Sequence, residues 1–208
     1  MIDKICEYLT NKIRKQMPEV DDERAEVINY GLQLVIGEIP KTFVLILIAY
    51  LCGVLKLSII ALLAIIPYRL VSGGVHLKTH IGCIVGTSLF YVGSALLSKY
   101  IILEPIYTKY ILIAITWAFS MVMIKLYAPA DTENVPILRK KERKIKKNLS
   151  YIIMTLTLLA SILIKDTVIS NLLIFLTLFQ TIWISKLTYK LTNNKYGYEE
   201  YVKLKNVT

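Results

Sequence analysis

Six strongly apolar segments divide the 208-residue chain, and they constrain its fold more than any other feature. A helix of about 20 apolar residues can cross the hydrocarbon core of a membrane. Hydrophobic residues make up 55% of the chain and the mean hydropathy is +0.56, more than the core of a soluble domain needs. We therefore predict an all-α integral membrane protein with about six transmembrane helices. The expected segments are residues 31–55, 57–70, 81–97, 107–127, 150–164 and 168–184.

Two of these segments are unusual. Residues 57–70 are short for a transmembrane helix, so this segment either crosses the membrane or re-enters it. The segment 31–55 carries Gln33, Glu38 and Lys41 in its first half. We expect these polar groups to lie at the level of the lipid headgroups. Alternatively, Gln33 faces an active site and donates a hydrogen bond to an oxyanion.

The polar stretches suggest how a single membrane-embedded domain over residues 1–208 is organised. Residues 1–30 form an amphipathic cytoplasmic region, because apolar residues recur at three- or four-residue steps over 1–17, as in an interfacial helix. Acidic residues 21–23 favour the start of a second helix. Residues 128–148 are expected to form a basic cytoplasmic loop, and the polar tail 186–208 is expected to fray.

The distribution of Lys and Arg predicts the orientation in the membrane. With six spans, twenty of these residues lie on the side of the termini and four on the other side. Cytoplasmic loops carry the excess of positive charge, so the termini, the basic loop and the loop before residue 81 are expected in the cytoplasm. This anchoring also explains the net charge of +10 without a nucleic-acid partner.

Residues 67–86 contain both histidines of the chain and one of its three cysteines, Cys83. Titratable groups at the edge of apolar segments are costly to bury, so they suggest function. A thiol becomes a strong nucleophile when a neighbouring base takes its proton, and a helix N-terminus stabilises the thiolate. Cys83 is therefore the candidate nucleophile. Arg69 either orders the adjacent loop or binds substrate.

Spacing alone leaves open which histidine is the base. His80 is the natural neighbour of Cys83 on a helix, whereas His76 reaches the thiol only if the backbone bends between them. Gly73 and Gly74 favour such a break. On an unbroken helix, His76, His80 and Cys83 would instead lie on one face and offer three metal ligands. A non-enzymatic peptide transporter is a further alternative, while the preferred prediction needs no metal or cofactor.

Two motifs resemble the AgrB family, the accessory gene regulator membrane endopeptidases of bacterial quorum sensing. They are Arg69-x-x-x-Gly73-Gly74-x-His76-x6-Cys83 and the later Tyr127-Ala-Pro-Ala-Asp-Thr-Glu-Asn, followed by a basic segment. The resemblance covers nearly the whole chain, and it implies that His76 and Cys83 are the catalytic pair. It leaves two possible roles for Asp131: its side chain either orients His76 or caps a turn.

The resemblance also implies a reaction and partners. Cys83 would cleave a short propeptide similar to AgrD, and an internal thiol or hydroxyl of the propeptide would then close a thiolactone or lactone ring. The implied setting is the bacterial cell membrane, with a multi-pass chain, an active site near the cytoplasmic face and a homodimer. The basic residues Lys140, Lys141 and Lys144 are candidates for holding an acidic part of the peptide.

Overall fold

A computed structural model gives the fold and describes residues 2–17, 19–75, 77, 79–133 and 136–207. The regular secondary structure of these residues is entirely helical, which confirms the predicted all-α class. An isolated parallel β-bridge joins Gly73 and Ala130. The chain divides into two compact units, residues 1–48 and 49–208, which are described separately.

The first unit contains helix α1 (Ile2–Gln16) and most of helix α2 (Asp22–Leu51). The backbone N–H of Arg24 donates to Asp21 Oδ1 at 2.8 Å, and Asp22 and Glu23 occupy the first turn of α2. Acidic groups there stabilise the positive end of the helix dipole. The expected start near residues 21–23 is therefore confirmed, whereas the membrane-surface position of α1 stays a prediction.

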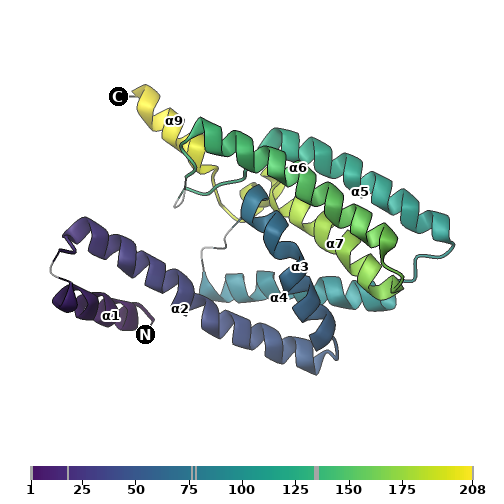
Figure 1. Ribbon diagram of the computed structural model, residues 1–208, viewed down its shortest axis with the longest axis horizontal. Helices are drawn as coiled ribbons and strands as arrows, with labels where there is room; N and C mark the ends of the chain where they lie inside the picture. The colour runs from purple at the N-terminus through teal and green to yellow at the C-terminus, as the bar shows by residue number, and fades with distance from the viewer. Residues whose placement is uncertain (1, 18, 76, 78, 134–135, 208) are drawn as a thin grey trace. The chain divides into compact units, whose positions relative to one another are not determined.

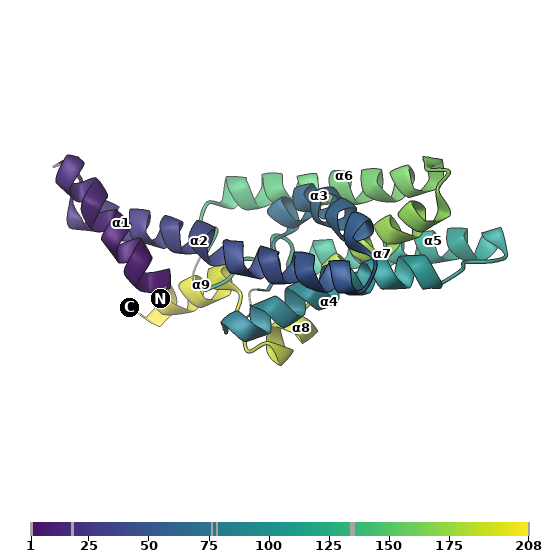
Figure 2. The ribbon, with the colours of Figure 1, turned by 90° about the horizontal axis from the view of Figure 1, so that it is seen from below.

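The second unit is a helical bundle around α7. Its helices are α3 (Leu55–Ser72), α4 (His80–Tyr100), α5 (Ile106–Tyr127), α6 (Lys140–Leu163), α7 (Thr167–Trp183), α8 (Lys186–Leu191) and α9 (Gly197–Val207). Figure 1 shows α5, α6 and α7 side by side, with α3 packed across α6 and α7. Helix α4 also packs on α7, and Figure 2 shows it from below with α8 nearby. Helix α7 is therefore the buried centre of the bundle.

Four of the described helices are long and apolar enough to cross a membrane, namely α2, α3, α4 and α5. Helix α3 has 18 residues, so the expected segment 57–70 gains a turn and reaches the length of a span. Helix α7 is apolar but has 17 residues. These helices identify a membrane protein, while the number of six spans stays a prediction.

Two stretches expected to lack structure are helical. Lys140–Leu163 forms the continuous helix α6, so most of the basic residues expected in a loop occupy its first turns. Lys, Arg and Glu are good helix formers, and they extend the apolar segment toward its N-terminus. The tail was expected to fray, yet it forms α8 and α9, and Tyr189 and Tyr196 are buried. The tail is ordered because these two rings pack against each other at 4.0 Å between centroids.

The bundle has two ends of different character. At the first, called the motif end, the end of α3, the start of α4, residues 128–131 and the end of α7 meet. At the second, called the turn end, Lys99 Nζ donates to the carbonyl of Gly53, and Asn171 Nδ2 donates to the carbonyl of Ile101. Both sequence motifs therefore lie at the same end of the bundle.

Candidate functional site

The loop that follows α3 depends on its two glycines. Gly73 and Gly74 have φ angles of 73° and 142°, a region that side-chain-bearing residues rarely adopt. A Cβ atom on Gly73 would also collide with the carbonyl oxygen of Ala130. The backbone N–H of Ala130 donates to the Ser72 carbonyl at 2.8 Å, and that of Gly74 donates to the Ala130 carbonyl at 2.9 Å. The two motifs are thus joined through their backbones.

Gln180 on α7 holds the same loop from the bundle interior. Its buried Nε2 donates to the Gly73 carbonyl at 2.7 Å and to Ser72 Oγ at 3.0 Å. Its Oε1 accepts from Arg69 at 3.5 Å, and the Arg69 guanidinium lies 4.8 Å from the Trp183 ring centroid. These contacts support the loop-ordering reading of Arg69. Gln180 was missed by the sequence analysis, although a glutamine within an apolar segment is itself a signal of a buried polar contact.

The break predicted before Cys83 is confirmed in the described backbone. Residues 73–75, 77 and 79 are not helical, and α4 begins at His80. Thr79 caps this helix, because its side chain accepts from the Gly82 N–H at 3.0 Å. The metal-site alternative requires an unbroken helix through positions 76, 80 and 83, whereas residues 77 and 79, which lie between the first two positions, are not helical.

Cys83 lies in the first turn of α4. Its backbone N–H donates to the Thr79 carbonyl at 2.9 Å, and its half-buried thiol lies 4.0 Å from Thr87 Oγ1. The catalytic partner assigned by the resemblance, His76, lies outside the described residues, and of His80 only the backbone is described. The thiol therefore stands at the positive end of a helix dipole, where a developing negative charge is stabilised.

Asp131, from the second motif, connects several segments at the motif end through hydrogen bonds. Its side chain is fully buried, and Oδ2 accepts from Arg143 at 2.9 Å. The same oxygen accepts from the backbone N–H groups of Ile137 at 2.9 Å and Tyr198 at 3.1 Å. Oδ1 is buried without a partner among the described residues. These bonds support the alternative in which Asp131 caps a turn. A contact between Asp131 and His76 stays a prediction.

Tyr189 connects the tail to the second motif. Its hydroxyl donates to the carbonyls of Ala130 at 2.9 Å and Asp131 at 3.0 Å. Burial raises the pKa of this hydroxyl, and the Asp131 carboxylate raises it further, so it stays protonated and able to donate at neutral pH. Tyr189 was missed because its partners lie 58 and 59 positions away in the sequence.

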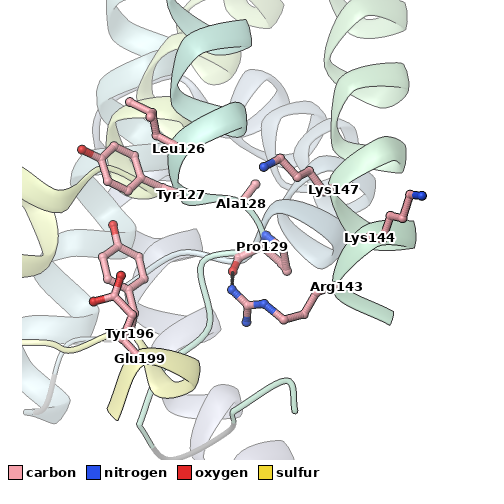
Figure 3. A pocket seen from close by; sticks show the side chains of 9 residues that line it. All are labelled: Leu126, Tyr127, Ala128, Pro129, Arg143, Lys144, Lys147, Tyr196 and Glu199. Carbon is pink, nitrogen blue, oxygen red and sulfur yellow. Dashed lines mark hydrogen bonds between the residues drawn. The ribbon is translucent and has the colours of Figure 1, made fainter. Parts of the chain in front are cut away.

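The basic residues expected to bind substrate lie at the start of α6. Lys140, Lys141 and Lys144 are exposed, and Lys144 borders a polar cavity of about 310 Å³ beside Pro129. Figure 3 shows Arg143 reaching toward the Pro129 carbonyl, whereas Lys144 points away from it. The structure therefore does not gather these three lysines around one pocket.

Gln33 lies on α2, in the first unit. A hydrogen bond from Gln33 to an oxyanion in the active site stays a prediction.

Comparison with known proteins identifies the family. The Accessory gene regulator B (AgrB) family matches residues 6–184. An AgrB-like protein of Clostridium acetobutylicum is 28% identical over 196 residues, covering 94% of this chain and 91% of the relative. An AgrB-like protein of Listeria monocytogenes is 28% identical over 190 residues, covering 91% of each. No solved structure matches the chain significantly. The chain belongs to the AgrB family, and this membership supports a role in the agr quorum-sensing system.

Proposed function

We propose that this protein is a membrane-embedded cysteine endopeptidase that cleaves an AgrD-like propeptide and promotes its cyclisation. The observation that carries the proposal is the position of Cys83 in the first turn of a helix, directly after a glycine-broken loop. Such a break is what His76 requires in order to approach the thiol. The match to the AgrB family supports the same assignment.

The reaction begins with proton transfer from the Cys83 thiol to His76. The thiolate attacks a peptide carbonyl, the C–N bond breaks, and His76 returns the proton to the departing amine. The acyl part remains attached to Cys83 as a thioester. A thiol or hydroxyl within the same peptide then displaces Cys83 and closes the ring. Because thioester exchange nearly conserves bond energy, this step requires that water be kept away from the intermediate.

The proposed setting is the cytoplasmic side of a bacterial membrane. Arg69 and the basic first turns of α6 lie at the motif end, which agrees with the excess of positive charge on cytoplasmic loops. The exposed Lys140, Lys141 and Lys144 would attract an acidic part of the propeptide, an interaction that salt weakens. The proposed partners are thus the propeptide, the lipid bilayer and a second copy of the chain.

Substitution of the proposed pair tests the proposal. In vesicles containing the full-length chain and the propeptide encoded beside it, Cys83→Ser and His76→Ala should each lower cleavage by at least about 100-fold. His80→Ala should retain most of the activity, and Cys52→Ser is the matched cysteine control. Loss of cleavage in the His80 variant alone would refute the choice of base. Full cleavage by Cys83→Ser would refute Cys83 as the nucleophile, whereas absence of cleavage by the unmodified chain would favour a non-enzymatic transporter or scaffold.

A further inference from the structure

An apolar cavity of about 400 Å³ lies between the loop after α3 and helices α4, α7 and α8. Ligand pockets typically measure about 300–1,000 Å³, so this one has room for a bulky side chain and neighbouring peptide atoms. Its lining consists of Val75, Leu77, Gly86, Leu89, Phe90, Phe179, Ile182, Trp183, Thr188 and Thr192.

The cavity offers no hydroxyl group in need of a partner. Thr188 Oγ1 donates to the Ile182 carbonyl at 2.7 Å, and Thr192 Oγ1 donates to the Thr188 carbonyl at 2.7 Å. The other lining residues are aliphatic, aromatic or glycine, and among them Trp183 adds one polar group, its indole N–H. A polar ligand group buried here would find few partners to replace its hydrogen bonds with water. The chemistry of the lining therefore selects an aliphatic or aromatic group.

The cavity begins beside the candidate nucleophile. Gly86 follows Cys83 by three residues on α4, so the two lie on neighbouring positions of one helix face. A Cβ atom on Gly82 would lie 3.6 Å from Leu77 Cβ, and one on Gly86 would lie 2.6 Å from Leu77 Cδ1. Leu77 therefore packs against Gly82 and Gly86, which lie one residue before and three residues after Cys83 on α4. One wall of the cavity lies within about one helical turn of the thiol.

The wall formed by Trp183 is held in place before any ligand binds. Its ring lies 4.9 Å from that of Phe90 between centroids, and the Arg69 guanidinium lies 4.8 Å from its centroid. The Trp183 carbonyl also accepts from the backbone N–H of Val75 at 3.4 Å. A preformed wall lowers the entropy cost of binding, which favours a true binding site.

We infer that this cavity holds the apolar side chain of the propeptide residue whose carbonyl carbon Cys83 attacks. The inference rests on the proposed function. That residue stays attached to Cys83 from the cleavage step until ring closure, so its side chain remains within a few ångströms of the thiol throughout. Filling the cavity holds the thioester in position and excludes water from it. The substrate class is therefore a peptide with a bulky apolar residue on the acyl side of the cleaved bond.

The test varies two things together: the propeptide residue on the acyl side of the cleaved bond, and Gly86 in the lining of the cavity. The full-length chain in lipid vesicles is given its propeptide with Ala, Val, Leu or Phe on the acyl side of the cleaved bond. The unmodified chain should cleave the Leu or Phe peptide about tenfold faster than the Ala peptide. Gly86→Ala places a methyl group against Leu77 and narrows the cavity, so it should shift this preference about tenfold toward small residues.

Gly93→Ala is the matched control, since it makes the same change on α4 where no atom lies within 4 Å. It should keep the original order of substrates. Equal cleavage of all four peptides by the unmodified chain would overturn the cavity assignment and leave the proposed function standing. A uniform loss in Gly86→Ala, without a change in preference, would also overturn it. Absence of cleavage for every peptide would refute the proposed function and the cavity with it.

Discussion

The motif end and the turn end of the bundle differ in how their backbones are fixed. At the motif end, buried side chains reach across from distant elements, as Gln180 does to Gly73 and Tyr189 does to Ala130. At the turn end, the contact from Lys99 to Gly53 is exposed and Asp166 caps α7 locally, although the buried Asn171 also reaches a distant carbonyl, that of Ile101. Buried hydrogen bonds are costly to leave unmade, so they fix geometry more strongly than exposed ones. Among the described residues, the end that holds the candidate nucleophile is fixed by buried contacts from both Gln180 and Tyr189.

The largest expected difference between the two ends is their side of the membrane. Cys52 is exposed at the turn end, next to Gly53, and Cys83 is half-buried at the motif end. In variants with a single cysteine, a membrane-impermeant thiol reagent applied to intact cells should label Cys52 and leave Cys83 unlabelled. Inverted vesicles should give the opposite pattern. Labelling of both residues from the same side would contradict the prediction that the two ends of the bundle lie on opposite sides of the membrane.

The next largest effect is expected for the ion pair at the motif end, in which the Asp131 side chain is fully buried and the Arg143 side chain is 22% exposed. Asp131→Asn removes the carboxylate partner of Arg143, and the cost should approach the lower end, about 3 kcal/mol, of the range for breaking a buried pair. Thermal unfolding in detergent should therefore show a large loss of stability. The matched control is Glu142→Gln on α6, which removes an exposed pair with Lys146 and should cost less than about 1 kcal/mol. Equal losses in the two variants would show that Asp131 does not hold the motif end.

A smaller effect is expected for the contact between the tail and the second motif. Tyr189→Phe keeps the ring but removes the hydroxyl that donates to Ala130 and Asp131, which should cost about 1–3 kcal/mol. Because Ala130 is bonded to Gly74, cleavage should slow even at temperatures where the variant is folded. Tyr201→Phe, an exposed position on α9, serves as the control. Unchanged cleavage in a destabilised Tyr189→Phe would restrict this hydroxyl to a structural role.

The sequence was sufficient for the features that depend on local composition. Apolar segments predicted the positions of the long helices, and Gly73-Gly74 predicted the break before α4, because glycine tolerates the φ angles found there. The start of α6 was placed ten residues too late, at Ser150 instead of Lys140, since hydropathy does not register the helix propensity of charged residues.

Contacts between distant residues were beyond the reach of the sequence. Gln180 and Gly73 are 107 positions apart, and nothing local to either residue predicts that they meet. The order in the tail was missed for the same reason. Tyr189 is buried by residues far from it in the chain, so the polar composition of the tail suggested fraying.

The central claim is that Cys83 carries the acyl part of the propeptide as a thioester. Mass spectrometry of the full-length chain mixed with its propeptide tests this most directly. The account predicts an adduct on Cys83 with the mass of the acyl part, cleaved by hydroxylamine and absent in Cys83→Ser. Cleavage of the propeptide with no adduct on Cys83, or with the adduct on Cys6 or Cys52, would contradict it.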